Sequence, residues 1–306
     1  MKKCILCYIS TSLIRIDKYL SIIYKISRNN IIFLIKKKNI LVNDKIIKKK
    51  YILKKYDVIK ILKNNFRNKI KIFPIKNKLD ILYEDKYILI INKKANTIVT
   101  PTFNNNKKTL YNYLLYYFNK SFLKKKNINL INRLDKDTTG IILIAKNFKV
   151  LLNIQNQFKL HKVIKKYILL VNGIFKKKRL CIKNNICRSK KNKKKMTVSM
   201  NRGKYSITFF KKIKILKNNI TLLKCYLKTG RTHQIRVHLS SINFPIYNDF
   251  MYKNNLYYKY TKKKIINRIC LHSYYIKFFH PIYKKYIIIY SKIPKDFTLF
   301  LKYLYY

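Results

Sequence analysis

The chain has 306 residues, with 72 Lys and Arg against only 10 Asp and Glu, so its formal net charge is +62. A surface this positive repels itself, and we therefore expect a polyanionic partner such as nucleic acid. Hydrophobic residues make up 48% of the sequence, which predicts a packed core. No apolar run reaches the roughly 18 residues of a membrane span, so we expect no membrane partner.

The composition carries a bias that makes its scarce residues informative. Lys, Ile, Asn and Tyr are abundant together, whereas Gly falls to four and Trp is absent. This pattern is typical of drift toward AT-rich codons, so we interpret much of the lysine excess as solvated surface. Six of the ten Arg nevertheless fall in the motifs described below: Arg15, Arg28, Arg133, Arg231, Arg236 and Arg268.

Cysteine usage and the first residues bear on metal binding and location. Cys4 and Cys7 have the spacing of half a zinc site, but no second pair accompanies them, so free thiols in a reducing compartment are the favoured interpretation. The start resembles a signal peptide but lacks a small-residue cleavage site. We expect a cytoplasmic protein of bacterial or endosymbiont type, with an organellar location as the alternative.

Residues 13–62 are predicted to form a small separate module. Ser27 is a candidate N-cap for a second helix, and Asn43-Asp44 is a tight-turn dipeptide between two β-rich runs. Apolar residues at helical spacing predict a first helix near the start of the module: Leu13, Ile16, Leu20 and Ile23. Five basic residues could share one face, although a solvated helix surface explains any single one of them: Arg15, Arg28, Lys36, Lys37 and Lys38.

This module resembles the S4-like RNA-binding domain, which pairs two short helices with a β-hairpin. The resemblance rests on Arg15-Ile16-Asp17-Lys18-Tyr19-Leu20, Ser27-Arg28 and Ile40-Leu41-Val42-Asn43. It implies recognition of the phosphate backbone and the shape of structured RNA, with Arg15, Arg28 and Lys36 as RNA-binding residues.

A linker is predicted over residues 63–78, followed by a larger domain over 79–306 that is rich in strand signals. Helices are expected over 109–120 and 147–159, and strands over 141–145, 166–171, 204–211 and 221–227. The alternation of residues 233–239 predicts another strand, with Gln234, Arg236 and His238 on one face. Residues 176–203 are basic and poorly periodic, which indicates an insert or a long loop.

Residues 131–147, INRLDKDTTGIILIAKN, contain two of the scarce carboxylates, Asp135 and Asp137. The continuous apolar run 141–145 predicts a buried strand, and Gly140 marks the turn before it. A carboxylate at the mouth of a buried strand is held rigidly and partly desolvated, so it needs a cationic partner to stay charged. We expect Asp137 to shape the loop by hydrogen bonding to the turn.

A candidate partner lies in residues 227–245, LKTGRTHQIRVHLSSINFP, where Gly230 marks a turn. Either Arg231 or Arg236 could reach Asp135, although an Arg–Asp pair is more often structural than catalytic. His233 and His238 suggest a metal site. Without a third ligand at suitable spacing, structural histidines are favoured, and we expect no metal.

Together these stretches resemble the RluA family of RNA pseudouridine synthases, which modify large-subunit ribosomal RNA and some tRNAs. The family motif H-R-L-D-x-D-T-S-G-L-L-L-x-A-K stands here as residues 132–146, and T-G-R-T-H-Q-I-R-V-H stands unchanged as 229–238. Two further motifs match residues scattered along the chain: Arg268, Leu271-His272-Ser273 and Phe279-His280-Pro281, and Lys165, Tyr167, Val171 and Gly173.

The resemblance implies an α+β fold in which an S4-like domain precedes a catalytic domain built on a mixed, largely antiparallel sheet. Asp135 would be the catalytic aspartate that drives cleavage of the uridine N-glycosidic bond, by attack at the sugar or by taking a sugar proton. Arg236 would pair with Asp135 and keep it charged, and Tyr167 would stack on the flipped base. Arg133 would hold the RNA open, and Arg231 would also bind RNA. No cofactor and no metal would be needed.

Within the family, the chain most resembles the D-type synthase of the large subunit, which implies the helix-69 loop of 23S rRNA as the target. We also expect the enzyme to be a monomer. Other large-subunit rRNA or tRNA sites, and a non-catalytic rRNA-binding assembly factor, are the alternatives. The chain departs from the family at several positions. Asn132 replaces a His, and Asn96, Asn243 and Asn248 stand in motifs that carry Gly, so we expect a marginally stable enzyme.

Overall fold

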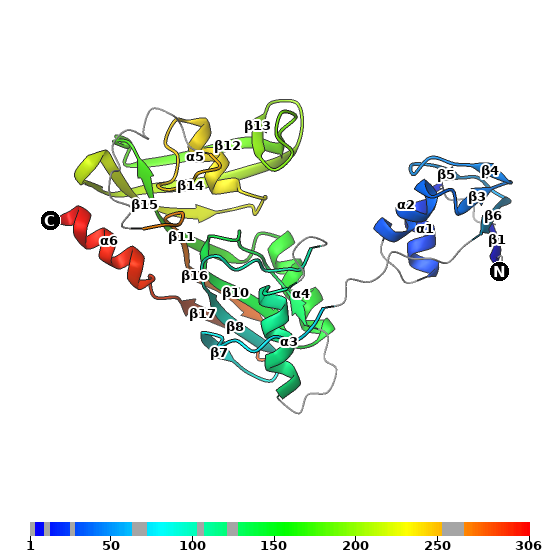
Figure 1. Cartoon of the computed structure of the whole chain (residues 1–306), viewed down its shortest axis with the longest axis horizontal. Helices are drawn as coiled ribbons and strands as arrows, with labels where there is room; N and C mark the ends of the chain where they lie inside the picture. The colour runs from blue at the N-terminus through cyan, green and yellow to red at the C-terminus, as the bar shows by residue number, and fades with distance from the viewer. Residues whose placement is uncertain are drawn as a thin grey trace. The chain divides into compact units, whose positions relative to one another are not determined.

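The computed structural model describes residues 4–8, 13–24, 28–62, 72–102, 107–120, 128–252 and 266–306. The chain divides into two compact units, Met1–Lys71 and Ile72–Tyr306 (Figure 1). Ser27 and residues 63–71 of the expected linker lie outside the described residues. Over the described ranges, every helix is too short or too polar to cross a membrane.

The smaller unit packs two helices against antiparallel strands. Its four-stranded sheet has the order β1-β6-β3-β4, and β2 pairs with β5. Its elements are β1 (Cys4–Tyr8), β2 (Ile14–Arg15), α1 (Ile16–Ile23), α2 (Arg28–Lys36), β3 (Ile40–Val42), β4 (Lys45–Ile46), β5 (Ile52–Leu53) and β6 (Asp57–Ile61). The expected turn at Asn43-Asp44 is confirmed, because both residues have positive φ (48° and 58°) and join β3 to β4 in a two-residue hairpin.

The face of α1 differs from the expected one. Ile16 and Leu20 are fully buried, but Leu13 is 80% exposed because the helix begins only at Ile16, and Ile23 is 48% exposed at its last turn. The charged residue Asp17, which was not part of the expected face, is also fully buried.

Asp17 holds α1 and α2 together through two arginines. Its carboxylate accepts hydrogen bonds from Arg15 (2.9 and 3.0 Å) and Arg28 (2.7 and 3.2 Å). Burial alone would raise the pKa of Asp17, but the hydrogen bonds and charges of Arg28 and Arg15 lower it below its usual value. Both arginine side chains are still partly exposed (40% and 48%), so their contact with Asp17 orients them without covering them.

The larger unit is built on one mixed sheet of eleven strands, in the order β13-β12-β14-β15-β11-β16-β10-β8-β7, with β17 paired to β16 and β9 paired to β10. The pair β10–β16 is parallel, and the other described pairs are antiparallel. The strands are β7 (Ile81–Glu84), β8 (Ile88–Lys93), β9 (Asn129–Leu130), β10 (Thr139–Ala145), β11 (Ile164–Asn172), β12 (Arg179–Arg188), β13 (Met196–Ser199), β14 (Lys204–Leu216), β15 (Ile220–Leu227), β16 (Leu271–His280) and β17 (Lys285–Tyr290).

Helices cover both faces of this sheet: α3 (Leu110–Lys120), α4 (Phe148–Lys159), α5 (Gln234–Ser241) and α6 (Lys295–Tyr305). Alternate residues of β10 separate two cores, because Ile141 packs with α4 and Ile142 packs with α3. Likewise Leu169 of β11 packs with α5, whereas Leu170 packs with α6. The expected helices at 109–120 and 147–159 and the buried strand at 141–145 are confirmed.

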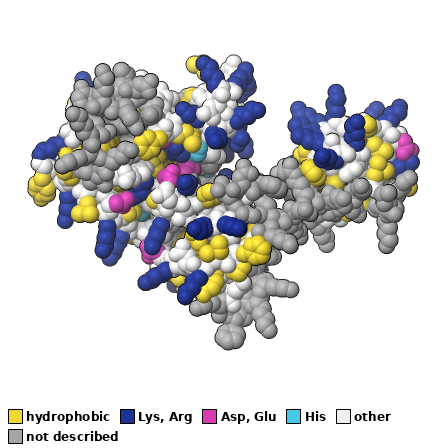
Figure 2. Space-filling view, in the orientation of Figure 1, with side chains coloured by type: hydrophobic (Ala, Val, Ile, Leu, Met, Phe, Trp, Pro, Cys, Tyr) yellow, Lys and Arg dark blue, Asp and Glu magenta, His cyan; other side chains and the backbone are white. Residues whose placement is uncertain are grey.

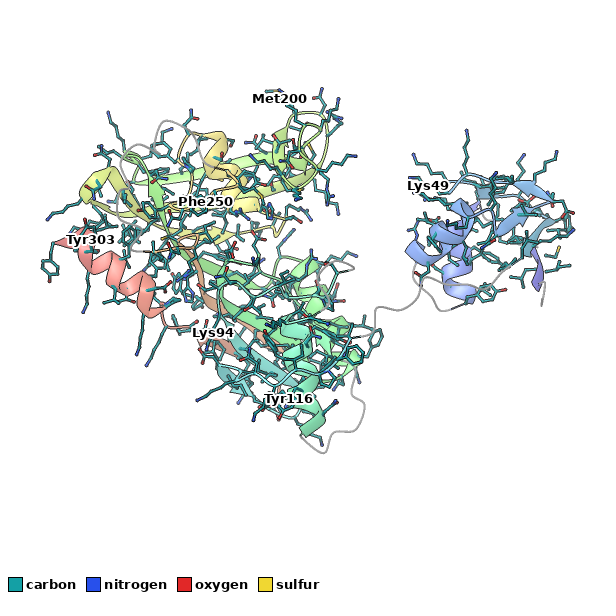
Figure 3. All side chains as sticks on the ribbon, viewed as in Figure 1. Lys49, Lys94, Tyr116, Met200, Phe250 and Tyr303 are labelled. Atoms are coloured by element: carbon teal, nitrogen blue, oxygen red, sulfur yellow. The ribbon has the colours of Figure 1, made fainter. Side chains whose placement is uncertain are left out.

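Two expectations are wrong. Residues 176–203 contain β12 and β13 rather than a loop, because most of their side chains are exposed and only Ile182 and Ile186 of β12 are buried, which hides the strand period. Met200, labelled in Figure 3, lies in the turn after β13 and is 93% exposed. Residues 234–241 form α5 and not a strand; residues 234–239 are all buried, so this helix has no polar face that periodicity could detect.

Candidate active site

Asp135 lies in the loop between β9 and β10, and buried Lys93 fixes that loop. The Lys93 ammonium donates to the carbonyl oxygens of Lys136 (2.8 Å), Lys94 (2.9 Å) and Thr97 (3.0 Å). Burial lowers the pKa of Lys93 to about 7, against the opposing charges of Asp137 and Asp135. Sequence reasoning missed this role, because a Lys at the end of a strand has the appearance of a surface residue in a chain this rich in Lys.

Asn132 stabilises the start of the same loop. Its side-chain oxygen accepts from the Leu143 backbone N–H (2.8 Å), and its amide donates to the Ile141 carbonyl (3.2 Å). The side chain thus continues the pairing of β9 with β10 beyond the last backbone pair, which gives Asn132 a structural function where the family carries His. The hydrogen bond expected from Asp137 to the turn is not seen, and its buried Oδ1 has no partner among the described residues.

Of the two candidate arginines, Arg236 reaches Asp135. Its Nη1 donates to Asp135 Oδ2 at 2.9 Å, while its Nε and Nη2 form a two-pronged contact with Asp249 (2.7 and 2.8 Å). Burial lowers the pKa of Arg236, but Asp249 and Asp135 together raise it above the ordinary value. The ring of Tyr252 lies against the guanidinium, 5.0 Å from its carbon.

Asp249 was not assigned a role from the sequence, although it follows Asn248, which stands in a family motif. It is 3% exposed and comes 13 residues after Arg236, beyond the end of α5. Asp249 holds Nε and Nη2 of the Arg236 guanidinium, so the remaining nitrogen, Nη1, points toward Asp135. Asp249 therefore positions the arginine, and Arg236 in turn positions the carboxylate.

The loop before α5 is held by Gln234. Its Oε1 accepts from the Thr229 hydroxyl and the Arg231 backbone N–H, each at 2.9 Å, and its Nε2 donates to the Ile207 carbonyl (3.0 Å). Arg231 therefore points elsewhere than Asp135, and its Nε donates to the Tyr205 carbonyl (3.1 Å). The polar residues of motif 229–238 that do not contact Asp135 therefore hold the loop before α5 in place.

The two histidines of this motif do not converge. His233 Nε2 lies 3.8 Å from Asp135 Oδ2, its Nδ1 lies 2.8 Å from the Tyr252 hydroxyl, and burial lowers its pKa. His238 instead contacts Ser206 (3.0 Å), and burial lowers its pKa to about 4. Within the parts of the chain that the structure describes, no three His, Cys, Asp or Glu side chains are grouped to hold a metal ion.

A cavity of about 630 Å³ opens beside Asp135. Tyr167 of β11 lines it, 7% exposed, and burial raises the pKa of this phenol against a hydrogen bond with Ser273 that lowers it. Arg133, Lys165 and Arg231 also line the cavity, and Arg133 is exposed. The volume falls in the range of small-molecule sites, so one nucleotide fits beside the Asp135–Arg236 pair.

Behind β10, the buried imidazole of His272 bridges Thr139 and the Ser291 carbonyl. Its Nδ1 lies 2.9 Å from the Thr139 hydroxyl, and its Nε2 lies 3.3 Å from that carbonyl. A carbonyl only accepts, so Nε2 carries the proton and Nδ1 accepts from Thr139. Arg268, which pairs with Asp296 at 2.6 Å, adds a positive charge close by. The neutral ring therefore fits its surroundings, and the cationic ring does not.

We expect protonation of His272 to weaken the fold in acid. Burial lowers its pKa to about 4 in the folded chain, below the usual 6.5, so the unfolded chain binds the additional proton between these pH values. Stability then falls as the pH drops below 6.5, and this histidine alone contributes a loss of about 2 kcal/mol at pH 5. NMR titration of the ring protons checks this; a midpoint near 6.5 for His272 contradicts it.

Comparisons with known proteins identify the family of the chain. A family model described as RNA pseudouridylate synthase matches residues 87–241. The chain is 33% identical over 296 residues to ribosomal large subunit pseudouridine synthase D of Blochmanniella floridana, covering 92% of each protein. It is 36% identical over 301 residues to ribosomal large subunit pseudouridine synthase C of Buchnera aphidicola subsp. Baizongia pistaciae, covering 94% of this chain and 93% of the relative.

A solved structure shares the fold at low sequence identity. Human RNA pseudouridylate synthase domain containing 4 superposes with a TM-score of 0.61 at 21% identity, covering 74% of this chain and 92% of its own. The segment matched by the family model contains Asp135, Tyr167 and Arg236. The match over half of the chain and the full-length similarity to the two bacterial synthases show that the chain belongs to the RNA pseudouridine synthase family, whose members are isomerases.

Proposed function

We propose that this enzyme converts uridines of large-subunit ribosomal RNA to pseudouridine, in the helix-69 loop, with Asp135 as the catalytic aspartate. The observation that carries the proposal is the contact of Asp135 with Arg236 at a cavity that fits one nucleotide. The names of the two bacterial relatives support large-subunit rRNA as the substrate.

The geometry of Asp135 suits work at the sugar of a flipped uridine. Arg236 bonds its Oδ2, and no described residue bonds its Oδ1, which leaves one carboxylate oxygen available to the substrate. In the proposed reaction, Asp135 attacks the sugar or removes a sugar proton, and the bond from C1′ to N1 of uracil breaks. The base turns and C5 bonds to C1′; the Asp135 oxygen leaves the sugar if it had attacked, or Asp135 returns the proton to the sugar if it had removed one. C5 then loses its proton and N1 gains one, so the product is an isomer of the substrate.

Tyr167 and Arg133 support the flipped state. Tyr167 lines the cavity with a ring whose raised pKa keeps it neutral, which suits stacking on a base. Arg133 is exposed at the cavity and would occupy the space that the base leaves in the RNA. All of these groups come from one chain, and we infer that the enzyme acts as a monomer.

Positive charge on both units suits RNA binding. Figure 2 shows Lys and Arg side chains spread over the drawn face of each unit, with few carboxylates among them. We propose that the smaller unit is an S4-like RNA-binding domain in which Arg15, Arg28 and Lys36 contact phosphates, and that Arg231 does so near the catalytic cavity. The partial exposure of Arg15 and Arg28 supports this assignment.

A second candidate is the same chemistry at another large-subunit site. It is favoured by the 36% identity to a C synthase, which is similar to the 33% identity to a D synthase. A non-catalytic assembly factor would not need the Asp135–Arg236–Asp249 arrangement, and its presence supports the enzymatic reading over that alternative.

The test is a carbodiimide primer-extension map of rRNA from cells with and without this protein. We expect specific pseudouridines to be absent without it, and those in the helix-69 loop identify the D-type target. If pseudouridines disappear elsewhere in large-subunit rRNA, the C-type alternative holds. An identical map in both strains would support the assembly-factor reading.

A further inference from the structure

Lys165 is a buried cation beside the cavity to which the proposed reaction gives no role. Its side chain comes from β11, two residues before Tyr167 and thus on the same face of the strand, and both line the cavity. Lys165 is 9% exposed, and its ammonium makes no hydrogen bond or ion pair with a described residue. Its described partner is the ring of Phe158, 5.2 Å from Nζ.

The surroundings of Lys165 are unfavourable for a positive charge in the free enzyme. Burial is the main cause that lowers its pKa to about 8; the nearby buried Cys225 opposes this shift, and the charge of Arg231 adds to it. Two cations therefore line one part of the cavity without a carboxylate between them. Such an arrangement is costly when empty and becomes favourable when an anion lies between the two groups.

Gly230 adds a second, independent observation. The other three glycines have φ between 101° and 115°, a conformation that side chains rarely adopt, but Gly230 does not have positive φ. The backbone conformation at this position therefore does not require Gly. A Cβ on Gly230 would lie 3.4 Å from Lys165 Nζ, so the missing side chain leaves open the space between the ammonium and the cavity.

We propose that Lys165, Gly230 and Arg231 form a binding site for one phosphodiester group of the RNA, next to the uridine that enters the cavity. The inference rests on the proposed function, because the phosphodiester group belongs to the RNA that we propose as the substrate. Lys165 and Arg231 donate to the phosphate oxygens, and Gly230 leaves room for them. A neutral uracil carbonyl would leave the repulsion between the two cations in place, whereas a phosphate removes it.

Two adjacent lysines of β11 give a matched pair of variants. Lys165→Met removes the buried charge and keeps the length of the side chain, and Lys166→Met removes one charge from an exposed side chain on the opposite face of the strand. Burying Met in place of an unpaired ammonium is expected to leave the fold intact, which thermal unfolding verifies. Lys165→Arg keeps the charge and should retain part of the binding.

Binding to an unmodified transcript of large-subunit rRNA is the first measurement. We expect Lys165→Met to weaken binding by about tenfold or more and to reduce the slope of log affinity against log salt by about one relative to Lys166→Met. In turnover assays KM should rise while kcat changes little. Equal affinity and equal salt slope for the two variants would overturn the proposal.

Small ligands then distinguish phosphate from base. Uridine 3′,5′-bisphosphate should bind the wild type at least about tenfold more tightly than uridine, and Lys165→Met should abolish most of that difference. An equal loss of affinity for both ligands would place Lys165 on the base and contradict the phosphate assignment. The proposed function is tested separately from the phosphate site. If the wild type forms no pseudouridine while Lys165→Met still binds RNA more weakly than the wild type, the reaction is misassigned and the phosphate site stands.

Discussion

Replacing Asp135 by Asn is expected to reduce pseudouridine formation by about 10⁴-fold or more, while RNA binding changes little. The amide keeps the size of the carboxylate, and its oxygen can still accept from Arg236 at the position of Oδ2. It cannot attack the sugar or accept a sugar proton. Tritium release from RNA labelled at C5 of uridine measures the reaction, and filter binding measures the affinity.

Asp137→Asn is the matched control for this experiment. Asp137 lies two residues further along the same loop, and its Oδ1 is buried without a hydrogen-bond partner among the described residues. It has no contact with Arg236, so we expect activity within about tenfold of the wild type. If Asp135→Asn retained activity while Asp137→Asn lost it, the catalytic assignment would move to Asp137.

The sequence located the loop of Asp135 because its composition made carboxylates, arginines and glycines scarce. It also predicted β10 and the two amphipathic helices, because each of these elements has its pattern within one short, continuous stretch of sequence. It did not predict Asp249 or Lys93 as supports of the site. Their roles depend on contacts with residues 13 and 43 positions away, and no local pattern reports such contacts.

The backbone φ angles explain how this chain can carry Asn where the family motifs carry Gly. Asn96, Asn243 and Asn248 stand in motifs that carry Gly, and each has positive φ, between 57° and 63°. Asn tolerates this left-handed region better than most residues, so these replacements preserve the turns at a modest cost. Three of the four glycines have φ above 100°, outside the left-handed region that Asn adopts, so Asn could not replace them without backbone strain.

A side chain should be least tolerated at Gly140. Gly140→Ala is expected to destabilise the chain by about 4 kcal/mol or more. Its φ is 115°, and an added Cβ would lie 2.2 Å from the backbone oxygen of Ser273. That oxygen belongs to β16, which pairs with β10 in parallel at Gly140, so relief of the overlap must separate the two strands. The loop of Asp135 leads directly into this pair.

Gly230→Ala provides the comparison, because Gly230 lacks positive φ and its nearest neighbour would be a flexible lysine end at 3.4 Å. We expect the melting temperature to fall by about 10 °C for Gly140→Ala and by less than about 3 °C for Gly230→Ala. Differential scanning calorimetry of both variants measures this. A stable Gly140→Ala protein would mean that β10 and β16 separate at little cost, and that the strand pair does not hold the loop of Asp135 in place.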